Sequence, residues 1–333
     1  MCKTKLPSPI MRDCPRGRFA PSPTGRMHLG NVYAALMSWL SVKLKGGKWV
    51  LRIEDLDSCR SRREYAEWIE DDLRWLGLEP DEGGLDDRGP GAPYSQSKRT
   101  AIYSAVLEQL ASRGLTYFCR CRRADILATQ APHQSDGRVV YSGRCREAGY
   151  SDGATRLVVP DRLIEFTDEI CGSQSVNLVN ECGDFVVRRA DGEFAYQLAV
   201  VVDDALMGIT EVVRGNDLLL SAAQQCYVYD LMGWERPVYT HFPLLCNKDG
   251  QRLSKRDKSL AMDELRSRMT PEEIIGRLAY MSRLVKSYCP MGVNDMTELL
   301  IEEGHGNPSA GLTATLKSLG MQIESQSPVY NTL

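Results

Sequence analysis

The chain lacks the features that mark membrane-spanning, secreted and strongly basic proteins. No apolar run among its 333 residues approaches the roughly 18 residues that a membrane-spanning helix needs. The segment Met1–Pro9 carries cations without an apolar segment behind them, which is not the pattern of a signal peptide. The formal net charge is −3, so the chain as a whole is not a polycation. A cytoplasmic location is the expectation that these absences leave.

The composition is that of a soluble enzyme with reduced thiols. Hydrophobic residues make up 43% and charged residues 26% of the chain. Its length predicts two to three domains, and the sequence contains no internal repeats. The eleven cysteines are scattered through a chain of this size. That distribution favours free thiols with one metal site over a disulfide framework.

Strand-like and helix-like segments alternate in the first third of the chain. Short strands are expected at 16–20 and 49–53, and amphipathic helices at 31–45, 64–76 and 97–113. This rhythm predicts an α/β fold with a doubly wound, Rossmann-like parallel sheet. It breaks after residue 115 and returns near residue 185. We therefore expect an N-terminal extension at 1–15, a catalytic domain at 16–115 and 185–260, an inserted zinc-binding subdomain at 116–184, a helical region at 261–303, and a weakly ordered tail at 304–333.

Two segments about 220 residues apart carry phosphate-binding chemistry. The segment Arg18–Asn31 places His28-Leu-Gly-Asn31 where the first strand turns into the first helix, which is where parallel sheets bind nucleotides. Gly30 lets a flat base approach the backbone, and His28 can donate a hydrogen bond to phosphate. The later segment Arg252–Arg256 offers Lys255, which can stabilise charge that develops on a pyrophosphate leaving group.

Several ordered motifs resemble the glutamate branch of the class I aminoacyl-tRNA synthetases. They are Arg18–Leu40, Arg52–Asp57, Phe194–Asp204, Gly208–Gly215 and His241–Leu245, within a resemblance that covers residues 16 to 300. The Arg252–Arg256 segment resembles the Lys-Met-Ser-Lys-Ser signature of that class, with Arg at its first and last positions and Lys255 intact.

The short region after Lys255 narrows the resemblance. Only residues 256–333 follow Lys255, so we expect no large anticodon-binding region of the kind that full glutamyl-tRNA synthetases carry. The chain therefore resembles the glutamyl-queuosine tRNA(Asp) synthetase family. The resemblance implies ATP-dependent activation of glutamate without tRNA, then transfer to queuosine, the modified wobble base of tRNA(Asp). The alternatives are a shortened glutamyl-tRNA synthetase that charges a 3′-terminal adenosine, and a catalytically silent paralogue that binds tRNA or zinc.

A glutamate substrate needs two cations and one anion, and the motifs contain them. Arg18 and Arg214 can grip carboxylates bidentately, and Glu54 can take the ammonium. One of Asp203 and Asp204 is expected beside the site, although a structural role for both is equally open. The resemblance implies that glutamate contacts Arg18, Ala20, Ser22, Glu54, Tyr196 and Arg214, and that ATP, with Mg²⁺, contacts His28, Gly30, Asn31, Gly215, Leu245 and Lys255.

A cysteine cluster in the predicted insertion indicates one structural zinc ion. Cys119, Cys121 and Cys145 have the spacing of thiolate ligands. Spacing alone offers His133 as the fourth ligand. The resemblance implies Tyr141 instead, because Tyr141-Ser-Gly-Arg-Cys145 matches the Tyr-x-Gly-x-Cys element of the family.

The same region contains a local excess of positive charge. Residues 113–146 hold seven arginines and two aspartates, a net charge of +5 in an acidic chain. A solvated surface loop would have the same composition. The resemblance implies that this region meets the anticodon stem-loop of tRNA(Asp), and we expect a monomer without a membrane partner.

Overall fold

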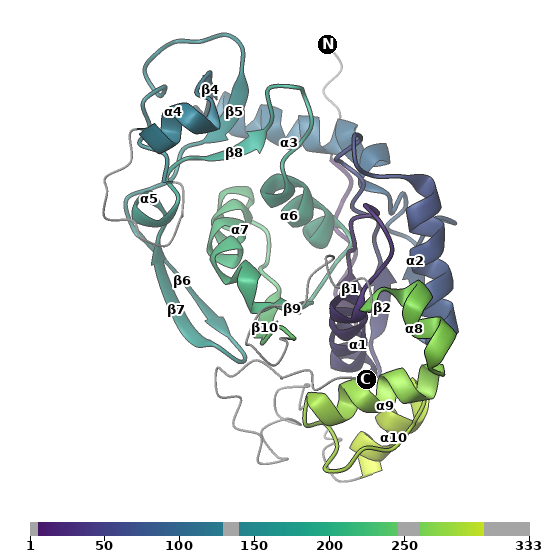
Figure 1. Cartoon of the computed structure of the whole chain (residues 1–333). Helices are drawn as coiled ribbons and strands as arrows, with labels where there is room; N and C mark the ends of the chain where they lie inside the picture. The colour runs from purple at the N-terminus through teal and green to yellow at the C-terminus, as the bar shows by residue number, and fades with distance from the viewer. Residues whose placement is uncertain (1–5, 129–139, 246–259, 303–333) are drawn as a thin grey trace.

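A mostly parallel sheet forms the centre of the protein (Figure 1). The computed structural model describes residues 6–128, 140–245 and 260–302. Seven strands lie in the order β3 (Glu82–Gly83), β2 (Lys48–Leu51), β1 (Arg16–Phe19), β9 (Glu211–Gly215), β10 (Val238–Phe242), β6 (Leu163–Asp168) and β7 (Gly172–Asn177). All neighbouring pairs are parallel except β6 and β7, which form an antiparallel hairpin. The predicted fold class is confirmed.

Alternation along the strands builds one core on each face of the sheet. On β2, Trp49 and Leu51 pack into one core and Val50 packs into the other, as the two-residue period of a strand requires. Helices α1 (Leu29–Lys43), α2 (Arg63–Trp75), α8 (Met262–Arg268), α9 (Pro271–Met281) and α10 (Val293–Leu300) contribute to the first core. Helices α3 (Thr100–Ser112), α6 (Tyr196–Leu206) and α7 (Leu219–Met232) contribute to the second. The sheet is therefore covered on both faces.

Local signals in the sequence explain where several helices begin. Helix α9 begins with Thr270 as its N-cap, Pro271 at its first position and Glu273 closing a capping box. Helix α1 begins at a similar reciprocal cap, formed by His28 and Asn31. These caps satisfy backbone N–H groups that have no partner within their own helix.

A second, smaller sheet lies beside the main one. Strands β4 (Thr116–Cys119), β5 (Ala154–Leu157) and β8 (Phe185–Arg188) pair antiparallel, with the short helices α4 (Arg123–Ala128) and α5 (Leu178–Glu181) in the intervening chain. The hairpin β6–β7 falls inside the predicted insertion but pairs with β10 of the main sheet. Strand β8, expected with the catalytic domain, pairs with β5. Strand pairing therefore crosses the predicted boundary at residue 184, and the division into domains stays a prediction.

No helix in the three described ranges is both long and apolar enough to cross a membrane.

Candidate active site

A cavity of about 480 Å³ opens at the carboxyl ends of the central strands β1, β9 and β10, beside the start of α1. Ligands of open parallel sheets bind at this edge. Eleven of the twelve residues predicted to bind glutamate or ATP line the cavity: Arg18, Ala20, Ser22, His28, Gly30, Asn31, Glu54, Tyr196, Arg214, Gly215 and Leu245. The twelfth, Lys255, lies outside the described residues, as does the whole Arg252–Arg256 motif. The structure therefore brings together side chains from positions 18 to 245.

The start of α1 presents backbone and imidazole groups to this cavity. His28 Nδ1 accepts a hydrogen bond from the Gly30 backbone N–H at 3.1 Å, so the ring proton of neutral His28 resides on Nε2. A Cβ atom on Gly30 would lie 2.9 Å from His28 Cε1, so only glycine leaves the imidazole in place. The site thus has a helix N-terminus with a ring N–H donor beside it, an arrangement suited to phosphate.

Arg18 is held by a buried carboxylate on α6. Its Nε donates to both oxygens of Asp204, at 3.2 and 3.3 Å, and the pair is almost fully buried. Asp204 also accepts from Arg52, which in turn donates to Glu54 at 3.0 Å. Burial alone would raise the pKa of Asp204, but Arg18 and Arg52 outweigh it and hold that pKa below its usual value. Asp204 is therefore the member of the predicted acidic pair that lies beside the site.

The other aspartate, Asp203, has a structural environment. It accepts hydrogen bonds from Gln96, Arg99 and Tyr103, all from the region around α3. Glu54 differs from both aspartates because it lines the cavity. Its burial raises its pKa above the ordinary value, against the lowering effects of Arg52 and Arg18.

Arg214, on β9, is held by side chains and backbone from a different set of elements. Its Nε donates to Nε2 of His241 at 2.9 Å, Nη1 donates to the Tyr196 hydroxyl at 3.4 Å, and Nη2 donates to the Leu218 carbonyl at 3.3 Å. His241 in turn lies 2.6 Å from Asp168 through Nδ1. His241 belongs to the His241–Leu245 motif, which assigns it no role, and none of the motifs contains Asp168. An apolar strand containing one histidine, Val238–Phe242, was the available signal.

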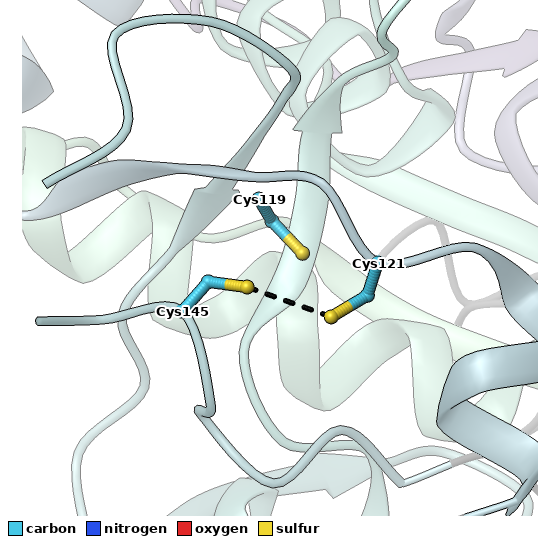
Figure 2. Close-up of side chains that lie close together, drawn as sticks. All are labelled: Cys119, Cys121 and Cys145. Atoms are coloured by element: carbon cyan, nitrogen blue, oxygen red, sulfur yellow. Dashed lines mark hydrogen bonds between the residues drawn. The ribbon is translucent and has the colours of Figure 1, made fainter. Parts of the chain in front are cut away.

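The cysteine cluster lies in the smaller sheet's region. Cys119, Cys121 and Cys145 point toward one another, with their Sγ atoms all within 4.8 Å (Figure 2). The Sγ atoms of Cys121 and Cys145 are 3.5 Å apart. A tetrahedral zinc ion with Zn–S bonds of about 2.3 Å separates its sulfur ligands by about 3.8 Å. The three cysteines can therefore hold a metal ion such as zinc.

Tyr141 joins this cluster through its hydroxyl group. The Tyr141 oxygen lies 3.4 Å from Cys119 Sγ and accepts from the Cys145 backbone N–H at 2.9 Å. The guanidinium of Arg156 lies 3.7 Å from the centre of the Tyr141 ring. His133, the alternative ligand from spacing, lies outside the described residues. A fourth donor atom, the Tyr141 oxygen, thus lies beside the three thiols.

The sequence matches the family of class I tRNA synthetases (E and Q), catalytic domain, over residues 16–284. The chain belongs to this family, as the sheet and the cavity at its carboxyl edge indicate. It is 44% identical to the glutamyl-Q tRNA(Asp) synthetase of Nitratidesulfovibrio vulgaris over 297 residues, covering 86% of this chain and 91% of that protein. The corresponding protein of Symbiobacterium thermophilum is 47% identical over 283 residues, covering 81% and 87% of the two chains. Within the class I family, the chain belongs to the glutamyl-Q tRNA(Asp) synthetases.

A solved structure agrees with this assignment at the level of the fold. A glutamate tRNA ligase from Elizabethkingia meningosepticum superposes with a TM-score of 0.73 at 31% identity, over 86% of this chain. The chain spans only 64% of that ligase. The expectation of a class I synthetase-like ligase is confirmed by these matches.

Proposed function

We propose that the protein activates L-glutamate with ATP in the absence of tRNA and then transfers it to queuosine at the wobble position of tRNA(Asp). The relatives are glutamyl-Q tRNA(Asp) synthetases, which supports glutamate and tRNA(Asp) as substrates. The observation that carries the proposal is the cavity that holds Arg18, Arg214, the carboxylate of Glu54 and a helix N-terminus, with Asp217 also in its lining. The two guanidinium groups and the Glu54 carboxylate are the charge complement of glutamate, and the helix N-terminus suits a nucleotide's phosphates.

The proposed chemistry distributes the substrate groups among these residues. Arg18 and Arg214 bind the two carboxylates of glutamate, Glu54 receives the ammonium, and Ala20, Ser22 and Tyr196 complete that part of the pocket. A carboxylate oxygen of the bound glutamate attacks the α-phosphorus of ATP. The bond from the α-phosphorus to the bridging oxygen breaks, and pyrophosphate leaves with the electron pair. The product is glutamyl-adenylate.

ATP is proposed to bind at the start of α1. His28 donates to phosphate through Nε2, while Gly30, Asn31, Gly215 and Leu245 line the nucleotide's part of the cavity. Leu245 lines the cavity, and Ala261 forms a β-bridge with His28. Residues on both flanks of the segment 246–259 therefore lie at the site. This supports Lys255 as the cation for the leaving pyrophosphate. Mg²⁺ accompanies ATP and offsets phosphate charge when bound.

One zinc ion is proposed to bind Cys119, Cys121, Tyr141 and Cys145. Its contribution is structural, because four ligands close the coordination shell and stabilise a region with a small core. Among the described residues of that region, the buried cluster has four members, Cys119, Ile126, Tyr141 and Cys145.

The RNA is proposed to approach across the smaller sheet. A second cavity, of about 460 Å³, lies there between α3 and β4 and is lined by Phe118, Tyr150 and Arg188 among others. Phe118 and Tyr150 are exposed, and the Arg120 guanidinium lies 4.7 Å from the Tyr150 ring centre. Exposed aromatic rings beside arginines suit the unstacked bases of an RNA loop. Arg120 and Arg146 form ion pairs with Asp152 and Asp184. These aspartates lie outside residues 113–146 and offset part of the positive charge of that segment.

Glutamate-dependent exchange between ATP and pyrophosphate tests the activation step. We expect exchange with no tRNA present. Exchange that begins only when tRNA is added would favour a shortened glutamyl-tRNA synthetase. No exchange under either condition, with binding of tRNA or zinc intact, would identify a catalytically silent paralogue.

A further inference from the structure

We propose that His241 and Asp168 are positioning residues that fix the guanidinium of Arg214 for the substrate carboxylate, with His241 as the neutral Nδ1–H tautomer. The inference rests on the function proposed above, because it assumes that Arg214 binds glutamate. It concerns two side chains that do not line the cavity.

The register of the sheet places these groups in line. His241 on β10 and Arg214 on β9 are direct partners in the parallel register, so their side chains emerge on one face. Asp168 ends the neighbouring strand β6. A chain of hydrogen bonds therefore crosses three adjacent strands, from Asp168 to His241 at 2.6 Å and from His241 to Arg214 at 2.9 Å.

The hydrogen bonds admit one protonation pattern. An arginine Nε–H can only donate, so Nε2 of His241 must accept. The ring proton of a neutral His241 must then lie on Nδ1, where the Asp168 carboxylate accepts it. Burial lowers the pKa of His241, and the cations Arg214 and Arg18 lower it further against Asp168, in agreement with a neutral ring.

Asp168 is itself held rigidly. Its Oδ1 accepts from the backbone N–H groups of Ile170 and Cys171, at 3.0 and 2.8 Å. The His241 backbone N–H donates to the same carboxylate, at 3.1 Å from Oδ2. Both Asp168 and His241 side chains are fully shielded from solvent. The chain of hydrogen bonds from Asp168 to Arg214 is thus anchored to the backbone at the tip of the β6–β7 hairpin.

The consequence for Arg214 is a fixed orientation with its charge intact. Its three hydrogen bonds within the described chain use three of its five N–H groups. The remaining two N–H groups can donate hydrogen bonds to a carboxylate. A neutral imidazole holds Arg214 without cancelling its positive charge, in contrast to Arg18, whose Nε partner is the carboxylate of Asp204.

Two substitutions separate positioning from folding. Asp168→Asn keeps an oxygen for the backbone N–H groups but presents an N–H₂ to Nδ1, which forces the ring proton onto Nε2, against the Arg214 N–H. His241→Asn retains a donor toward Asp168 and loses the acceptor for Arg214. His241→Gln is the conservative variant, because its amide oxygen can replace Nε2. Glu165→Gln is the matched control, as Glu165 is an exposed carboxylate on the same strand β6.

We expect Asp168→Asn and His241→Asn to raise KM for glutamate roughly 10- to 100-fold in ATP–pyrophosphate exchange, the range for a lost hydrogen bond to a charged group. KM for ATP should stay near its original value, His241→Gln should recover most of the loss, and Glu165→Gln should match the wild type. Unchanged KM for glutamate in both Asn variants, or equal losses for glutamate and ATP, would overturn the inference.

The tautomer of His241 can be measured on the wild-type protein, independently of any variant's activity. Long-range ¹H–¹⁵N correlations of labelled histidine should show His241 as the neutral Nδ1–H tautomer at pH 7. A cationic ring or the Nε2–H tautomer would contradict the inference. If the wild type shows no glutamate-dependent exchange while the tautomer is as stated, then the proposed function fails and the hydrogen-bond chain stands.

Discussion

Glu54 combines burial with a proposed role that requires its negative charge. Burial raises its pKa above the ordinary carboxyl value, and Arg52 opposes that rise only in part. Binding of the glutamate ammonium requires the ionised form. We therefore predict that KM for glutamate rises on mild acidification, beginning at a higher pH than an exposed carboxylate would allow. Exchange kinetics from neutral to acidic pH measure this.

The pH effect is separable from unfolding. A carboxyl whose folded-state pKa lies above its unfolded value takes up protons more readily in the folded chain, so its protonation adds stability as pH falls. Protonation of Glu54 therefore does not itself lower the melting temperature, whereas the buried His241, whose pKa is lowered, favours the unfolded chain on acidification in the wild type and in Glu54→Gln alike. Glu54→Gln should raise KM for glutamate at all pH values and remove the rise. A wild-type pH profile that Glu54→Gln reproduces would contradict the assignment.

Arg18 offers a second test at the residue scale. Arg18→Lys keeps a positive charge near Asp204 but loses the planar fork that binds carboxylates bidentately. We expect glutamate use, as kcat/KM, to fall by about tenfold or more, the range for a charge-assisted hydrogen bond, with ATP binding little changed. Steady-state exchange with each substrate varied in turn measures the difference. Equal effects on both substrates would remove Arg18 from the glutamate pocket.

At the scale of elements, the metal ligands can be resolved by zinc analysis of purified variants. Tyr141→Phe removes the oxygen that lies 3.4 Å from Cys119 Sγ, whereas His133→Ala tests the ligand suggested by spacing. We predict loss of tightly bound zinc in Tyr141→Phe and retention in His133→Ala. The reverse pair of results would show that the resemblance misassigned the fourth ligand.

The segment that carries Lys255 provides another prediction at this scale. A preorganised donor to charge that forms in the transition state typically contributes about 10²- to 10³-fold in rate. We expect Lys255→Ala to lower the rate of ATP–pyrophosphate exchange by roughly 10²-fold or more. Arg256→Ala, at the adjacent position, is the control for a general loss of positive charge. A near-normal rate for Lys255→Ala would exclude that lysine from the mechanism.

The sequence predicted elements better than it predicted how they combine. The helix 31–45 was expected from apolar spacing and a glycine pair, and α1 occupies Leu29–Lys43. The strand 49–53 was expected from its apolar run, and β2 occupies Lys48–Leu51. Pairing between distant strands leaves no such local signal. This is why the β6–β7 hairpin was assigned to the insertion, although β6 pairs with β10 in the main sheet.

The site shows the same division between local and long-range information. Motifs identified Arg18 and Arg214 because each lies within a resemblance of several residues. No local pattern predicts a role for Asp168, because its contact with His241 joins positions 73 residues apart in the chain. Periodicity and composition cannot report such a contact. The fold must first bring β6, β9 and β10 together.

At the scale of the whole molecule, the central claim is that the acceptor is a modified anticodon base. The cavity at the carboxyl edge of the main sheet is the proposed site of adenylate formation, and the smaller sheet offers exposed aromatic rings and arginines. Phosphate contacts by arginine should make binding sensitive to salt, whereas selection of the base depends on its fit to the pocket. A short RNA that contains only the anticodon stem-loop should therefore be a sufficient substrate.

The most direct measurement is transfer of labelled glutamate to the anticodon stem-loop of tRNA(Asp), prepared with queuosine or with guanosine at the wobble position. We predict transfer to the queuosine stem-loop and none to its guanosine counterpart. Removal of the 3′-terminal adenosine from full-length tRNA(Asp) should have little effect. Transfer that requires the terminal adenosine and ignores queuosine would contradict the account and identify a shortened glutamyl-tRNA synthetase.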